Sequence, residues 1–120
     1  MSMINLKTTL ISMDGTTKNE TKGILTDGKL SYEENGAKTT VSIEENMVIM
    51  LVKDDEHVLE LTFKNQEQTS GIYTLYSTNS KISIDIYTKL LQIENNCIKI
   101  VYNFYDEERT YEIEYEVIVW

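Results

Sequence analysis

The chain has 120 residues and a formal net charge of −9, from twenty acidic and eleven basic side chains. A chain of this length suits one domain, over residues 1–120, and needs neither disulfides nor metal to complete its core. The acidic excess argues against nucleic acid and anionic membrane as partners, because Lys and Arg supply the charge neutralisation on which such binding rests.

Targeting and redox signals are sparse. Residues 1–7 lack the basic and unbroken apolar stretches of a signal peptide, and no run of about eighteen apolar residues suggests a membrane-spanning helix. Cys97 is the only cysteine, which excludes an internal disulfide and a cysteine-rich metal site. We therefore expect a soluble, cytoplasmic protein whose single thiol is structural.

Three Asx–Gly pairs divide the first part of the chain, at Asp14–Gly15, Asp27–Gly28 and Asn35–Gly36. Each predicts a type I′ hairpin turn, because both central residues of that turn need a positive φ. The segments around them are rich in Ile, Val, Thr and Tyr, which favour strands. The predicted strands cover residues 4–12, 20–26, 29–33 and 38–43.

The rest of the chain alternates apolar and polar residues between short polar breaks, which again predicts strands. These strands cover residues 47–53, 57–64, 71–77, 81–88, 97–105 and 109–119. Residues 88–94 are the one segment in which a short turn of helix fits. Residues 47–52 are apolar on both faces, so we expect this strand to be covered on its outer side or to lie at an overlap of the sheet.

Strands joined by such short loops pair antiparallel, because a parallel crossover needs a dozen or more residues. With this many strands, a closed barrel or a two-sheet sandwich protects the sheet edges. We predict an all-β fold, an antiparallel up-and-down β-barrel of about eight to ten strands. The two-sheet β-sandwich is the alternative.

Short motifs recur in a characteristic order. Residues 31–34 read Ser-Tyr-Glu-Glu and are followed by Gly36, then by Lys53 and by Phe63 ten residues later, and then by an alternating strand that ends in Thr88. In this order and spacing the chain resembles the YwiB-like family of uncharacterised bacterial β-barrel proteins. The resemblance implies a lipocalin-like (calycin) barrel and no particular activity.

The sequence departs from the family pattern at three positions. Lys53 stands where arginine is usual, and Asp55 and Ser80 stand where glycine is usual. Lysine cannot reproduce the planar, bidentate contact that an arginine forms. A site that relatives build on that arginine would therefore change here.

No residue pattern specifies catalysis. His57 is the only histidine, so one chain cannot build a multi-histidine metal site. Nucleophile-elbow, P-loop and dinucleotide motifs are absent. The acidic pairs, such as Glu33–Glu34 and Glu107–Glu108, place neighbours on opposite strand faces or in turns. We predict a protein that is not an enzyme, with no catalytic residues, no metal and no cofactor.

The tyrosines are the most informative candidates for binding. Several share strand faces with Ile, Val and Phe, so they should point into the barrel, whose lumen is either filled by side chains or holds one small ligand. If it holds a small, partly apolar ligand, polar side chains at the mouth would add contacts. The candidate ligand-binding residues are Tyr32, Glu34, Lys53, Tyr102, Arg109, Tyr111 and Tyr115.

The alternative function is a surface-mediated protein–protein interaction by a barrel with a filled lumen. It needs an exposed apolar patch, for which Ile118, Trp120 and the two-faced strand at residues 47–52 are the candidates. The sequence leaves both functions open, and it does not specify an oligomeric state.

At physiological salt we expect no measurable binding of this protein to DNA, RNA or anionic vesicles, because its net charge of −9 repels phosphate. Fluorescence anisotropy with labelled oligonucleotides and co-sedimentation with vesicles would measure it. Proteins that bind nucleic acid nonspecifically still do so with dissociation constants of about 10⁻⁴ to 10⁻⁶ M at such salt concentrations. Salt-sensitive binding in that range would contradict the expectation.

Overall fold

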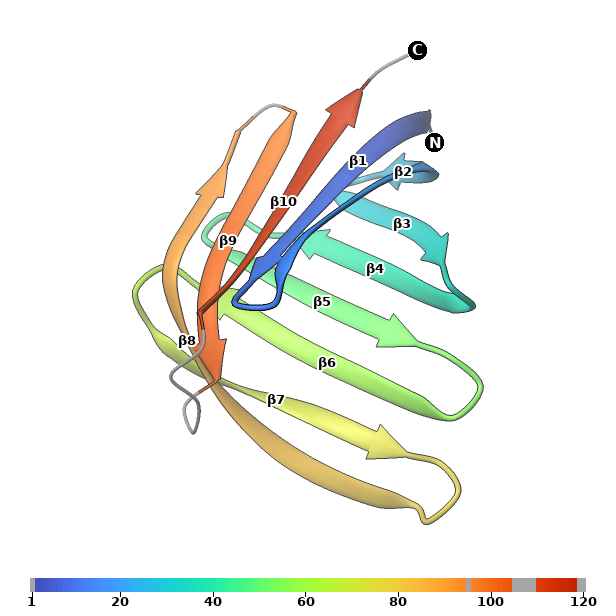
Figure 1. Cartoon of the computed structure of the whole chain (residues 1–120), viewed down its shortest axis with the longest axis vertical. Coiled ribbons are helices and arrows are strands. Elements are labelled where there is room, and N and C mark those ends of the chain that lie inside the picture. Colours follow the sequence, from blue (N-terminus) through green and yellow to red (C-terminus); the bar gives the residue numbers. More distant parts are fainter. Residues whose placement is uncertain (1, 95, 105–109, 119–120) are drawn as a thin grey trace.

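The computed structural model describes residues 2–94, 96–104 and 110–118, and it describes side chains for residues 3–94, 96–104 and 110–116. Within these ranges ten antiparallel strands form one closed barrel (Figure 1). The predicted barrel is confirmed, and the two-sheet sandwich is excluded. In chain order the strands are β1 (Ser2–Ser12), β2 (Gly15–Thr26), β3 (Lys29–Glu34), β4 (Ala37–Ile43), β5 (Met47–Lys53), β6 (His57–Lys64), β7 (Gln68–Leu75), β8 (Ser80–Ile93), β9 (Cys97–Phe104) and β10 (Thr110–Ile118).

Each strand pairs with the next one along the chain, and β10 returns to pair with β1. In this closing ladder Asn5 lies opposite Ile118, and Ile11 lies opposite Glu112. Figure 1 shows β1 and β10 side by side, with the start of β1 near the end of β10. Because the loops are short and every pair is antiparallel, the topology is up-and-down.

Two of the three predicted type I′ turns are confirmed. Asp27 and Gly28 have φ values of 47° and 78°, and Asn35 and Gly36 have values of 53° and 81°. At Asp14–Gly15 the predicted hairpin is present, but this pair does not form the centre of its turn. Ser12 pairs with Gly15, so the two turn residues are Met13 and Asp14, and the Asp14 amide donates a hydrogen bond to the Ser12 hydroxyl at 3.3 Å.

Residues 88–94, the one segment in which a short turn of helix fits the sequence, contain no helix, because β8 continues as a strand to Ile93. Its ladder with β9 contains an irregularity of the β-bulge type between Thr88 and Leu90. A bulge inserts one extra residue, so Thr88 and Leu91 both face the barrel interior.

The lumen is filled at one end. We call it the closed end; it is the end at which β1 begins and β10 ends. Inward side chains of alternating residues pack there into a core from which water is excluded. The largest fully buried hydrophobic side chains are Phe63, Ile4, Leu6, Leu30, Ile86, Ile100, Val41 and Val48.

The outer face of β5 lacks the cover that its apolar sequence predicts. β5 packs against its neighbours β4 and β6, and its outward Ile49 and Leu51 are half-buried. Ile49 lies between Ser42 and Thr62 on those strands. Neighbouring side chains, rather than an additional segment, shield this face among the described residues.

Gly71 allows β6 and β7 to approach each other closely. A Cβ atom at Gly71 would lie 2.4 Å from the backbone oxygen of Glu60 and 2.7 Å from Cδ2 of Leu61. Real Cβ atoms do not come so close to a backbone oxygen, so the ladder would have to move. This glycine is therefore required for packing rather than for an unusual φ.

We expect Gly71→Ala to lower the free energy of unfolding by about 1 to 3 kcal/mol, the usual cost of forcing extra atoms into a packed interior. Chemical denaturation followed by circular dichroism would measure it. Ser83→Ala, at an exposed position on the adjacent β8, is the control and should change stability by less than about 0.5 kcal/mol. Equal effects of the two substitutions would contradict the close approach.

Candidate functional site

The end of the barrel opposite the closed end, where β3 and β5 end, is partly hollow; we call it the open end. A cavity of about 330 Å³ lies there among inward side chains of β1 to β5 and β10. Its apolar lining includes Leu10, Val52 and Ile113. The sequence left two alternatives, a lumen filled by side chains and a lumen with room for a small ligand. Each of them describes part of the lumen, which is filled at the closed end and partly hollow at the open end.

Two tyrosines from β3 and β10, which are separated in the barrel by β1 and β2, meet at the inner surface of this cavity. The hydroxyl oxygens of Tyr32 on β3 and Tyr115 on β10 lie 3.1 Å apart and share a hydrogen bond in which either can donate. Their ring centroids are 5.9 Å apart, with the ring planes tilted by 60°. The Tyr115 hydroxyl also lies 4.0 Å from Sδ of Met50, and the Thr39 side chain hydrogen-bonds to Tyr32.

Both phenols stay protonated over the usual pH range. Burial raises the pKa of Tyr115 well above its ordinary value, and the negative charge of Glu34 adds to this shift. Burial also raises the pKa of Tyr32, against the opposing effect of its hydrogen bonds to Tyr115 and Thr39. The cavity thus presents neutral hydroxyl groups, which both donate and accept hydrogen bonds.

Glu34 supplies a carboxylate at the rim of the cavity. The side-chain amide of Asn19 donates a hydrogen bond to Oε1 of Glu34. Asn19 belongs to the first part of β2, which extends beyond the β2–β3 ladder, because that ladder covers only residues 23–26 of β2. This contact therefore holds the β1–β2 hairpin against the end of β3.

Tyr102 and Tyr111 point inward, but they form a separate aromatic cluster beside the cavity. Tyr102 is 7% exposed and stacks on Tyr111, with ring centroids 5.5 Å apart. Its ring also packs against Phe63 at 5.0 Å and Phe104 at 5.7 Å. Burial raises the pKa of Tyr102 to about 12. These rings fill the lumen and do not line the cavity.

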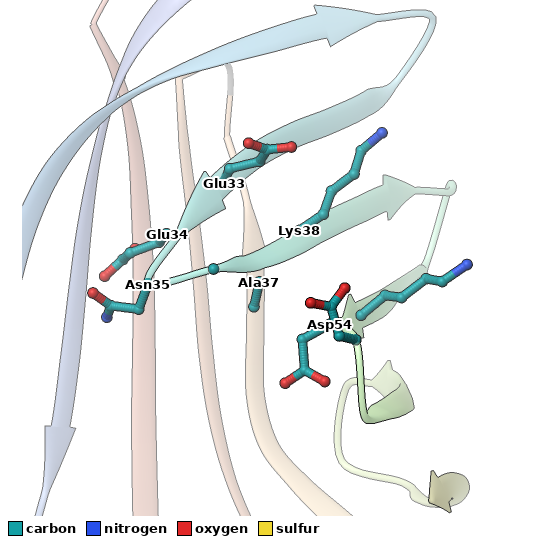
Figure 2. A pocket seen from close by; sticks show the side chains of 9 residues that line it. Glu33, Glu34, Asn35, Ala37, Lys38 and Asp54 are labelled. Carbon is teal, nitrogen blue, oxygen red and sulfur yellow. The ribbon is translucent and has the colours of Figure 1, made fainter. Parts of the chain in front are cut away.

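Lys53 is not brought to the cavity. It is exposed, and it follows the inward-facing Val52, so its side chain lies on the outer face of the barrel. There it borders a shallow depression of about 550 Å³ between the β3–β4 and β5–β6 turns (Figure 2). Figure 2 also shows that the Lys38 side chain points away from Glu34. Arg109 lies outside the described residues.

The structure thus brings Tyr32, Glu34 and Tyr115 together out of the predicted residues. It adds Thr39 and Met50, whose inward direction follows from alternation with Val41 and Val48 and could have been found in the sequence. The sequence did not indicate that Asn19 points inward, because Asn19 precedes the strand predicted at residues 20–26.

The described residues hold no cluster of three or more His, Cys, Asp or Glu side chains that could bind a metal ion. In the same part of the chain, no helix is long and apolar enough to cross a membrane.

Comparison with known proteins supports the fold. No protein-family model matches the chain, and no curated protein matches it. The crystal structure of the YwiB protein from Bacillus subtilis is similar, with a TM-score of 0.68 and 19% sequence identity. The similarity covers 97% of this chain and 92% of that one. The chain therefore has a YwiB-like fold.

The buried tyrosines make stability dependent on alkaline pH. Tyrosine in an unfolded chain has a pKa of about 10, whereas burial raises the pKa of Tyr102 to about 12 in the folded protein. A raised folded pKa means that stability is complete below pH 10 and falls as the pH rises towards the folded value. We expect the free energy of unfolding to fall between about pH 10 and 12, and less steeply in Tyr102→Phe. Denaturation at a series of pH values would measure both slopes, and equal slopes would contradict the burial of this hydroxyl.

Proposed function

We propose that this barrel is a non-enzymatic binding protein that holds one small, partly apolar molecule in the cavity at its open end. The observation that carries the proposal is the cavity itself, with its volume of about 330 Å³. Pockets for small ligands typically have volumes of about 300 to 1,000 Å³. In an otherwise filled lumen, a hollow of this size is what a ligand site requires.

The distribution of polar groups supports the same proposal. Side chains of Leu10, Val52 and Ile113 give the cavity an apolar surface, while the Tyr32 and Tyr115 hydroxyls and the Glu34 carboxylate are localised polar groups. Ligand sites combine these two features, because apolar surface supplies affinity and a few fixed polar groups supply orientation.

We propose further that the barrel is lipocalin-like (calycin) and that the protein is bacterial and acts in the cytoplasm. The free thiol of Cys97 fits a reducing compartment. Nucleic acid and membrane are not proposed as partners, because of the net charge of −9, and no cofactor is proposed.

A protein–protein interaction through the surface is the second candidate function. The β7–β8 hairpin extends away from the rest of the barrel in Figure 1, and its Ile72, Tyr76 and Ile82 are 48%, 46% and 56% exposed. Ile72 and Ile82 lie on opposite faces of this hairpin, because Ile72 pairs with Ser83 and Ile82 pairs with Tyr73. A partner that binds around the projecting hairpin would contact both faces. Trp120 and the side chain of Ile118, which the sequence suggests for this role, lie outside the described part.

The ligand-binding proposal can be tested by blocking the cavity. A thermal-shift screen of small aromatic amines, alcohols and acids should give hits whose melting-temperature increase grows with the logarithm of ligand concentration. Thr17→Trp should abolish these shifts, because Thr17 lines the cavity and is exposed enough to accept a larger side chain.

Thr16→Trp is the matched control, because Thr16 is exposed on the same strand and does not line the cavity. It should leave the shifts unchanged. Shifts that survive Thr17→Trp would place binding elsewhere and contradict the proposal. A complete lack of hits would instead favour the protein–protein interaction.

A further inference from the structure

We propose that the cavity at the open end selects an organic cation, a ligand with a protonated amine next to its apolar part, and that Glu34 is its counter-ion. This inference rests on the proposed function and specifies the chemical class of the ligand. It follows from the charges around the cavity, from the partners of Glu34 and from the aromatic rings beside it.

The charges that line the cavity have one sign, although Glu34 also borders the outer depression that Lys38 and Lys53 line. Glu34 is the one acidic side chain among the described residues that line it, and those residues include no Lys, Arg or His. An anionic ligand would therefore find no opposite charge there. A protonated amine would find one, because a carboxylate forms its strongest hydrogen bonds with charged donors.

The charge of Glu34 is positioned but not neutralised by the contact that the structure shows. The Asn19 amide donates to Oε1 of Glu34, and an amide carries no formal charge. A carboxylate offers about four acceptor sites on its two oxygens, so Glu34 can accept further hydrogen bonds. Lys38 follows on the next strand, but its side chain points away from Glu34 (Figure 2).

The influence of Glu34 extends into the cavity. Its negative charge is one of the causes that raise the pKa values of Tyr32 and Tyr115. A field that opposes the ionisation of two phenols also favours a cation placed between them and Glu34. The same charge therefore acts on the space that a ligand would occupy.

The tyrosine rings complete a site suited to an amine. The faces of aromatic rings attract cations through their quadrupole. Tyr115 is only 2% exposed, so the half-buried Tyr32, which also lines the cavity, is the ring that a ligand can reach. The net charge of −9 adds a long-range attraction for cations. An aromatic ring, a single carboxylate and an apolar wall together fit a small amine with a hydrocarbon or aromatic body.

Three matched probes test the inference on the wild-type protein: phenethylammonium, 2-phenylethanol and phenylacetate. They share one ring and differ in charge. We expect titration calorimetry to show that phenethylammonium binds about tenfold or more tightly than the alcohol, and that the acid does not bind detectably. Affinity for the amine should fall as salt is added, because ions screen the attraction.

A pair of adjacent substitutions gives the matched control. Glu34→Gln should weaken amine binding by about tenfold and leave binding of the alcohol unchanged. Glu33→Gln should change neither, because Glu33 is exposed and lies outside the described lining of this cavity. Melting curves of both variants verify folding, and the wild-type comparison of the three probes does not depend on either variant.

The outcomes separate the two proposals. If the alcohol or the acid binds as tightly as the amine, or if Glu34→Gln has no effect, the inference of a cationic ligand is overturned while the ligand-binding function stands. If none of the probes binds, or if Thr17→Trp leaves amine binding intact, both the inference and the proposed site are overturned.

Discussion

The pairing of β1 with β10 is the constraint on which the rest of this structure depends. It closes the sheet, so that inward side chains of strands distant in the sequence face one another across a lumen. Tyr32 and Tyr115 are separated by 83 positions, yet their hydroxyls meet because of this closure. Without it, the alternating face of each strand would be exposed to water on an open sheet.

Closure of the barrel also explains why the lumen is filled at one end and contains a cavity at the other. At the closed end, branched aliphatic side chains and Phe63 fill the interior completely. At the open end, the inward positions carry Thr39, Glu34 and Asn19, whose side chains are short or are held at the rim by hydrogen bonds. A cavity remains there because these side chains do not extend across the barrel, while the closed end supplies the packing that stabilises the fold.

Much of the fold could be predicted from the sequence, because period-two alternation determines which face of a strand is buried. The same rule placed Tyr102 and Tyr115 inside and would have placed Lys53 outside, as its neighbour Val52 shows. The bulge near Thr88 could not be predicted, because a local change of register leaves the composition of a strand unaltered. The composition of the cavity depends on which strands lie opposite each other, and no local pattern encodes that arrangement.

The first part of β2 has a consequence for the dynamics of the cavity entrance. Residues 15–22 pair with β1 alone, whereas the remainder of β2 pairs on both sides. Local opening of a segment with one ladder breaks fewer hydrogen bonds, and such segments exchange their amide hydrogens through openings of low free energy. The bond between Asn19 and Glu34 holds this segment against the rim of the cavity. A ligand that forms hydrogen bonds with the Glu34 carboxylate would compete with Asn19 for it, and residues 15–22 would then open more easily.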